Sequence, residues 1–192
     1  MIDVFLRWYP QNYLRMRLAS AVLERLGSYA DIQVHGIFTG LNRFSNYQLA
    51  TQVPKERFHI QSKEVANAMA QSEIYCVIDD DQLPIPNDFF RLGVAALEAH
   101  PDYGMLAGFP LEYGLQGQPY AGRTEDVIEA HAIGCPYFTR RGILSFPDGP
   151  LHQYDGILSK VVTDQGLKTG FARKCLYNHL GYGFSQVEHA KA

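Results

Sequence analysis

The sequence predicts one α/β domain, in which a mostly parallel central sheet carries helices on both faces. Its 192 residues suit one domain with a substantial core and are few for two. Segments of strand character alternate with segments whose apolar residues recur at helical spacing. The run from Ile74 to Ile78 is short, apolar and rich in β-branched residues, which is typical of a buried parallel strand. Such sheets bind ligands at the carboxyl ends of their strands.

The N-terminal part of the chain opens with a strand and a helix. Ile2 to Trp8 is apolar enough for a strand, and apolar residues then repeat every four positions from Leu14 to Leu26. Asn12 is a suitable cap for that helix, and Gly27 ends it. Two further strands are expected, at Asp31 to Phe38 and at Arg57 to Ile60.

The alternation continues to the end of the chain. A helix over Lys63 to Gln71 precedes the strand Ile74 to Ile78, and Asn87 starts a helix that ends before Pro101. Residues 110 to 126 mix Gly, Pro, Tyr and charge without a period, so a loop is expected there. The remaining expected elements are strands at Gly104 to Phe109, Ala130 to Phe138 and Phe171 to Tyr177, and a helix at Asp155 to Gln165.

Composition excludes several classes of protein. Seventeen Lys and Arg against twenty Asp and Glu give a net charge of −3 without a basic stripe, which argues against nucleic-acid binding. An apolar content of 46% is far above that of a disordered chain. No apolar stretch approaches the roughly 20 residues of a transmembrane helix. Asp3 and Arg7 interrupt the N-terminus where a signal peptide needs an apolar run.

Three cysteines, at widely spaced positions and without a Cys-x-x-Cys pair, predict buried free thiols. They are Cys76, Cys135 and Cys175. An odd number of isolated cysteines suits a reducing compartment and argues against a structural zinc site. Together with the missing leader, this predicts a cytoplasmic protein.

The strongest chemical feature is the triplet Asp79-Asp80-Asp81, directly after the predicted buried strand. Gly-rich phosphate loops and the common hydrolase and metalloprotease motifs are absent from the sequence. One interpretation of the triplet is a solvated turn, since Asp bonds nearby backbone amides. The other is a cation site, because adjacent carboxylates repel one another unless a cation offsets them. If the strand continued, Asp79 and Asp81 would point to one side and Asp80 to the other, a pair of oxygen donors suited to Mg²⁺ or Mn²⁺.

Three segments in order carry a resemblance to a known family. The segment "IYCVIDDDQLPIP" resembles the Asp-x-Asp motif of GT-A-fold glycosyltransferases of the family-2 type. The segment "YDGILSKVVTDQGLKTGFARKCLYNHL" is similar to the part of that family in which an acidic residue opens a helix and a strand then leads to a His. The opening "IDVFLRWYPQNYL" resembles its first strand, with Pro10 in place of the usual Asn. The resemblance implies a single-domain, Rossmann-like GT-A fold over nearly the whole chain.

The resemblance also implies roles for individual residues. Asp79 and Asp81 would bind Mn²⁺ or Mg²⁺ bridging a nucleotide-sugar diphosphate, with Asp80 near the ribose. His179 would complete the metal sphere. Asp155 would be the general base for the acceptor hydroxyl, although an Asp at that position is also a good helix N-cap. His179 has an ordinary alternative as a surface histidine.

Contacts to the donor are predicted less directly. The family places an Asp after the second strand, whereas this chain has "GIFTGLNRF" there, with Thr39 at the turn. Arg7, Tyr9, Thr39 and Lys63 are candidates by position, the two cations being able to face phosphates. Each has an equally ordinary interpretation as a surface residue.

The function expected from these observations is a metal-dependent glycosyltransferase. It would transfer a sugar from a nucleotide-sugar, taken as a UDP-sugar, to a carbohydrate or other hydroxyl acceptor. Inversion of the anomeric centre is expected, and retention, which needs different chemistry, stays open. Residues 1–109 would bind the nucleotide-sugar, and residues 110–192 would hold the acceptor and catalytic groups. Two alternatives stay open: a nucleotide-sugar-binding module without transfer activity, and a sugar-1-phosphate nucleotidyltransferase. The latter normally has a Gly-rich loop after the first strand, and "RWYPQNYLRMR" has no glycine.

Overall fold

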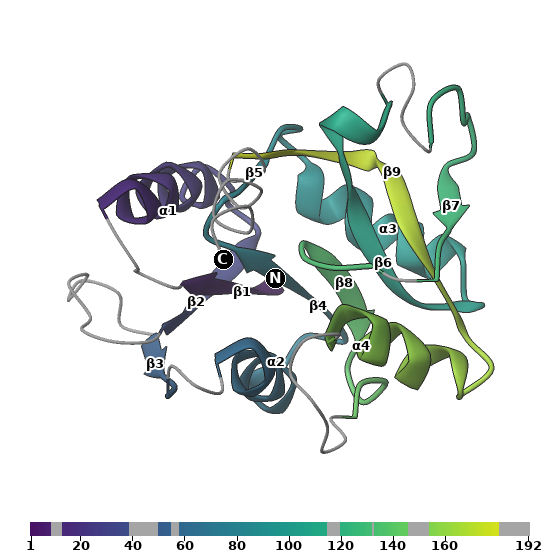
Figure 1. Ribbon diagram of the computed structural model, residues 1–192, viewed down its shortest axis with the longest axis horizontal. Coiled ribbons are helices and arrows are strands. Elements are labelled where there is room, and N and C mark those ends of the chain that lie inside the picture. Colours follow the sequence, from purple (N-terminus) through teal and green to yellow (C-terminus); the bar gives the residue numbers. More distant parts are fainter. Residues whose placement is uncertain are drawn as a thin grey trace, which may run out of the picture.

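The computed structural model describes residues 1–8, 13–38, 50–54, 58–114, 120–131, 133–145 and 154–180. Within these residues, nine strands form one sheet with the order β3-β2-β1-β4-β8-β6-β9-β5, and β7 pairs with β9 (Figure 1). The strands are β1 (Ile2–Trp8), β2 (Ile32–Phe38), β3 (Ala50–Gln52), β4 (Ile74–Asp79), β5 (Gln82–Pro84), β6 (Tyr103–Pro110), β7 (Val127–Glu129), β8 (Tyr137–Arg140) and β9 (Lys168–His179). The helices are α1 (Tyr13–Leu26), α2 (Phe58–Met69), α3 (Phe89–Ala99) and α4 (Tyr154–Thr163), with a 3-10 turn η2 at Leu111–Gly114.

The predicted fold class is confirmed: the chain is an α/β domain with helices on both faces of a central sheet. Strands β3, β2, β1 and β4 are parallel to one another, as are β6 and β9. The pairings of β8 with β4 and β6, and of β5 and β7 with β9, are antiparallel. The sheet is therefore parallel through its N-terminal half and mixed beyond β4.

Alternating side chains divide the core into two apolar layers. On one face, α1 and α3 pack against residues that include Val4, Leu6 and Ile78. On the other face, α2 and α4 pack against residues that include Phe5 and Val77. Figure 1 shows α1 and α2 on opposite sides of β1 and β4. Because successive residues of a strand point to opposite faces, β1 and β4 are buried on both, and their carboxyl ends are firmly placed.

Two predicted strands are wrong. Residues 58–60 begin helix α2, and the third strand is instead the short β3. A four-residue segment with only two apolar residues is too short to distinguish the two periods. The segment predicted as one strand from Ala130 to Phe138 lies between β7 and β8, and only its last two residues join β8. Pro136 has no amide hydrogen to donate to a sheet, which explains why β8 begins at the next residue.

Smaller differences concern the ends of elements. The final strand runs on to His179, so this histidine is the last residue of β9. Helix α4 begins at Tyr154, which places Asp155 in its first turn and not at its N-cap. Helix α3 begins at Phe89, and the side chain of Asn87 instead accepts a hydrogen bond from Arg25 Nη2 at 3.0 Å.

The thiol prediction is confirmed, since Cys76, Cys135 and Cys175 are all buried and free.

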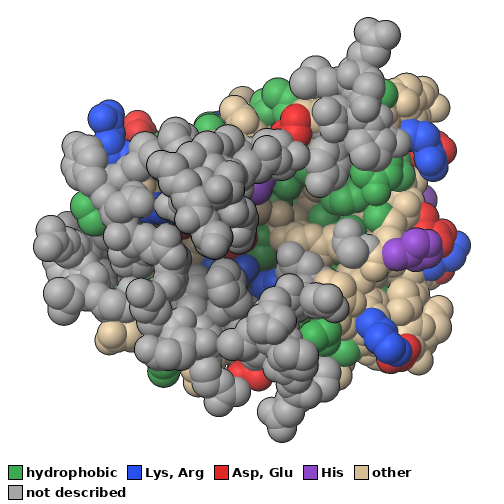
Figure 2. All heavy atoms as spheres, in the orientation of Figure 1, with side chains coloured by type: hydrophobic (Ala, Val, Ile, Leu, Met, Phe, Trp, Pro, Cys, Tyr) green, Lys and Arg blue, Asp and Glu red, His purple; other side chains and the backbone are tan. Residues whose placement is uncertain are grey.

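Charged side chains drawn in colour in Figure 2 alternate in sign along the right-hand rim of the face shown. Among the helices described, none is both long and apolar enough to cross a membrane.

Candidate active site

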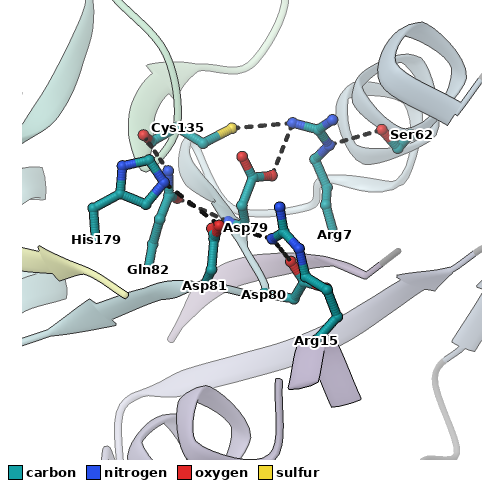
Figure 3. Close-up of polar contacts among 9 residues, drawn as sticks. All are labelled: Arg7, Arg15, Ser62, Asp79, Asp80, Asp81, Gln82, Cys135 and His179. Atoms are coloured by element: carbon teal, nitrogen blue, oxygen red, sulfur yellow. Dashed lines mark hydrogen bonds and ion pairs between the residues drawn. The ribbon is translucent and has the colours of Figure 1, made fainter. Parts of the chain in front are cut away.

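The acidic triplet lies where the carboxyl ends of β1 and β4 meet. Arg7 and Asp79 are register partners on these parallel strands. The chain leaves strand geometry after Asp79, turns through Asp80 and Asp81, and enters β5 at Gln82. The condition for the alternation of the three carboxylates is therefore not met, because the strand ends at Asp79 and a turn has no two-residue period. The site is drawn in Figure 3.

Arg7 is an internal counter-ion of the site. Its Nη1 lies 2.9 Å from Asp79 Oδ1 and donates to Cys135 Sγ at 3.3 Å, while its Nε donates to Ser62 Oγ at 2.8 Å. The side chain of Arg7 is 5% exposed and that of Asp79 is 33% exposed. Burial alone would lower the pKa of Arg7, but the attraction of Asp79 and the contact with Cys135 raise it on balance. The guanidinium therefore stays charged inside the domain.

Arg15, from the first turns of α1, forms ion pairs with both of the other two carboxylates. Its Nη1 lies 3.0 Å from Asp80 Oδ1 and 2.7 Å from Asp81 Oδ2. Both carboxylates are buried, with side chains 4% and 6% exposed. Burial opposes the charge of Arg15, but Asp81 and Asp80 together raise its pKa. Helix α1 thus contributes a cation to a turn more than sixty residues away in the sequence.

His179 reaches the same turn from the end of β9. It is the register partner of Gln82 across β5 and β9, and the amide of Leu180 donates to Asp81 O at 2.8 Å. His179 Nε2 lies 3.5 Å from Asp81 Oδ2. Burial lowers the pKa of His179, but Asp81, aided by Asp79 and Glu112, raises it overall. Correspondingly, burial raises the pKa of Asp81, while His179 and Arg15 lower it on balance.

Gln82 joins the turn to the strand on its other side. Its Oε1 accepts from the Asp79 amide at 2.9 Å, and its Nε2 donates to Cys135 O at 2.5 Å. The side chain is buried, so both amide atoms are used inside the protein. This bridge fixes the path of the backbone as it leaves β4 and thereby the placement of the three carboxylates.

The donor set fits a divalent cation in part. A carboxylate oxygen and an imidazole nitrogen, as in Asp81 and His179, are suitable ligands for Mn²⁺. Within the described residues, no three His, Cys, Asp or Glu side chains are already gathered to hold a metal ion. Asp79 is engaged with Arg7, so its role as a ligand stays a prediction. Hard cations at nucleotide sites often take only one or two protein ligands and complete their sphere with phosphates and water.

Of the four residues predicted to contact the donor, the structure describes two, Arg7 and Lys63. Lys63 is buried on α2, next to Ser62, with its Nζ 5.8 Å from the centre of the Tyr137 ring. Arg7 is also buried, so neither cation is a surface residue. Tyr9 and Thr39 lie outside the described residues. Their contacts with a nucleotide stay predictions.

The place of the predicted base, Asp155, in the fold follows from the packing of helix α4. Leu158, Ser159 and Val162 of α4 are buried, and Ser159 Oγ accepts from the Ile133 amide at 3.2 Å. These contacts fix the helix against the face of the sheet that it shares with α2. The role of Asp155 itself stays a prediction.

Sequence reasoning did not find three of the residues around the triplet: Arg15, Ser62 and Gln82. Gln82 follows the triplet directly and could have been noticed. Nothing in the spacing of α1 distinguishes Arg15 from Arg17, because only the packing of α1 decides which arginine reaches the turn.

Comparison with solved structures shows that the fold is that of GT-A glycosyltransferases. S. aureus TarS 1-349 superposes with a TM-score of 0.68 at 13% identity, covering 94% of this chain and 61% of that one. The mannosyltransferase PcManGT from Pyrobaculum calidifontis, in complex with GDP-Man and Mn²⁺, gives 0.70 at 14% identity, covering 93% and 56%. GalNAc-T7 with UDP, GalNAc and Mn²⁺ gives 0.59 at 12% identity, covering 93% and 43%.

The chain spans at most about three-fifths of the length of these structures. TarS has also been solved in complex with UDP-GlcNAc. No protein-family profile and no curated protein sequence matches this chain. At these identities, the likeness establishes the fold.

Proposed function

We propose that this protein is a metal-dependent glycosyltransferase that uses a nucleotide-sugar, specifically a UDP-sugar, and transfers the sugar to a hydroxyl acceptor. One observation carries the proposal. Asp81 and His179, which are far apart in sequence, lie side by side at the carboxyl ends of β4 and β9 in a GT-A fold. This is the edge of an α/β sheet at which ligands bind.

Asp81 and His179 would hold Mn²⁺ or Mg²⁺, with Asp79 as a further ligand. When bound, the ion supplies Lewis-acid stabilisation to the departing nucleoside diphosphate. Asp80 would lie near the ribose, and Arg7 and Lys63 would add positive potential at the diphosphate. Because Arg7 is fixed by Ser62 and Cys135, it would act as a preorganised charge that does not reorganise during the reaction.

Asp155 would act on the acceptor. As a general base it would accept the hydroxyl proton while that oxygen attacks the anomeric carbon from the face opposite the diphosphate. The bond from the anomeric carbon to the diphosphate breaks as the new glycosidic bond forms, and the configuration inverts. A carbohydrate acceptor fits this reaction, as does any other exposed hydroxyl.

A turnover assay tests the proposal. Purified protein is incubated with a panel of UDP-sugars and GDP-mannose in Mn²⁺, and release of the nucleoside diphosphate is measured with and without EDTA. We expect release with a UDP-sugar that EDTA abolishes and added Mn²⁺ restores. Asp81→Asn should lower the rate by more than about 100-fold, a typical loss when a transition-state charge contact is removed. The matched control is Asp164→Asn, an exposed Asp paired with Lys160.

Three results would contradict the proposal. Release of the nucleoside diphosphate at the same rate with and without EDTA would exclude a metal-dependent reaction. Binding of the donor by calorimetry, with neither hydrolysis nor transfer, would indicate a binding module. Formation of a nucleotide-sugar from a sugar-1-phosphate and a nucleoside triphosphate would indicate a nucleotidyltransferase.

A further inference from the structure

Arg15 contacts the same carboxylate oxygen of Asp81 that faces His179. Asp81 Oδ2 lies 2.7 Å from Arg15 Nη1 and 3.5 Å from His179 Nε2. A divalent cation bound to this oxygen lies about 2.0 to 2.6 Å from it. An ion at that distance and a guanidinium in its present position would bring two positive charges into contact on one oxygen.

The net charge of the site also indicates that Arg15 and a divalent cation do not bind Asp81 at the same time. Asp79, Asp80 and Asp81 carry three negative charges against the two positive charges of Arg7 and Arg15 that contact them, which leaves one negative charge among these five residues when His179 is neutral (Figure 3). If Arg15 moves away, Arg7 remains and the carboxylates carry two uncompensated negative charges. That number matches one divalent cation. With Arg15 in place, the loaded site would instead carry an excess positive charge in a buried environment, which is costly.

Arg15 is also the member of the site best able to move. Arg7 is almost fully buried and makes three polar contacts from within the sheet. Arg15 extends from the surface helix α1, and its side chain is 32% exposed. A long, partly exposed arginine can take a new rotamer without opening the core.

We propose that Arg15 is a built-in counter-ion that a divalent cation must displace from Asp81, so that this arginine sets the affinity of the site for metal. The inference rests on the proposed function, because that function places the cation at Asp81. It goes further in naming which residue opposes metal binding. Asp80, which is the second partner of Arg15, holds the guanidinium close to the site.

Titration of the protein with Mn²⁺ in the absence of nucleotide tests the inference directly. The signal of free Mn²⁺ in electron paramagnetic resonance gives the dissociation constant for the wild type, Arg15→Gln and Arg17→Gln. Arg17 is the matched control, since it is an exposed arginine two residues further along α1. We expect Arg15→Gln to bind Mn²⁺ about tenfold more tightly than the wild type, and Arg17→Gln to bind it within about twofold.

A second variant guards against a folding defect in Arg15→Gln. Arg15→Lys keeps the charge but lacks the planar fork, so we expect an intermediate affinity. In the wild type, nuclear magnetic resonance of the guanidinium groups during a titration with Mg²⁺ should show the Arg15 signal moving toward that of a solvated arginine. The Arg7 signal should change less.

Three outcomes would overturn the inference: equal Mn²⁺ affinity in Arg15→Gln and Arg17→Gln, weaker binding in Arg15→Gln, or no Mn²⁺ binding by any variant. Turnover with nucleotide-sugars is measured separately, so these outcomes are distinguishable from failure of the proposed function. A wild type that transfers sugar while Arg15→Gln shows unchanged Mn²⁺ affinity refutes the displacement alone.

Discussion

Arg7 and Asp79 face each other as register partners at the ends of two adjacent parallel strands, and their side chains form an ion pair with Nη1 2.9 Å from Oδ1. The pair lies between the core and the proposed donor site. Its charges are therefore relevant both to stability and to the potential that a diphosphate would encounter.

Removing Arg7 should destabilise the protein strongly. Arg7→Met leaves Asp79 without its partner, and breaking a buried ion pair costs about 3 to 5 kcal/mol. Because Asp79 is 33% exposed, water compensates in part, so we expect a fall of about 2 to 3 kcal/mol in the free energy of unfolding. Urea denaturation measures it. The double variant Arg7→Met/Asp79→Asn should recover part of the loss.

The exposed pair of Arg91 with Asp31 provides the control for this prediction. The side chain of Arg91 is 72% exposed, so Arg91→Gln should change the free energy of unfolding far less than Arg7→Met does. Equal decreases in the free energy of unfolding for Arg7→Met and Arg91→Gln would show that burial of the Arg7 ion pair does not increase its contribution to stability.

Asp155→Asn should separate donor binding from transfer. If Asp155 is the general base, the variant loses about 10²- to 10⁴-fold in turnover. Its affinity for UDP in Mn²⁺, measured by calorimetry, should stay within twofold of the wild type. Asp164→Asn, just beyond the other end of α4, is the control with unchanged turnover. Full transfer activity in Asp155→Asn would exclude this residue as the base.

Asp3 should stabilise the folded protein at neutral pH and lose this contribution in acid. Burial raises the pKa of Asp3, but backbone hydrogen bonds from Ser72 and Gln71 and a contact with His35 lower it below the usual 3.8 on balance. A lowered pKa in the folded state means that the contribution is complete above the unfolded pKa and is lost as the pH falls through the folded one. The relevant window therefore begins near pH 3.8 and extends below it.

Asp3→Asn should accordingly lower the free energy of unfolding at pH 7 by about 2 kcal/mol, which is typical of hydrogen bonds to a charged group. Below pH 3.8 the difference between the two proteins should shrink. Urea denaturation at a series of pH values measures both effects. A difference that stays constant from pH 7 to pH 2 would contradict the assignment.

Gly93 on α3 allows the helix to approach β8 closely. A Cβ at this position would clash with the ring of Phe138, which is fully buried. Gly93→Ala should therefore destabilise the protein by about 1 to 3 kcal/mol through overpacking. At Gly156 on α4, nothing in the part of the chain that the structure describes lies within 4 Å of an added Cβ, so Gly156→Ala should instead stabilise by up to about 1 kcal/mol through helix propensity. Thermal unfolding distinguishes the two signs.

Local sequence was sufficient to predict secondary structure and burial where these depend only on the residue's own segment. The run Ile74 to Ile78 could be read as a buried strand because every residue in it is apolar, and all five are buried in the structure. The wrong strand at residues 57–60 arose from a run too short to show a period. The wrong strand over 130–138 arose because apolar residues also line the irregular segment before β8.

By itself, the sequence determined the α/β class, the buried thiols and the position of three acids at the end of a strand. Periodicity and adjacency along the chain are enough for these. Only the tertiary structure decided that Arg7 pairs with Asp79, that Arg15 rather than Arg17 reaches Asp80 and Asp81, and that His179 faces Asp81. Such pairings depend on strand order and on the rotation of α1, which many non-local contacts determine together.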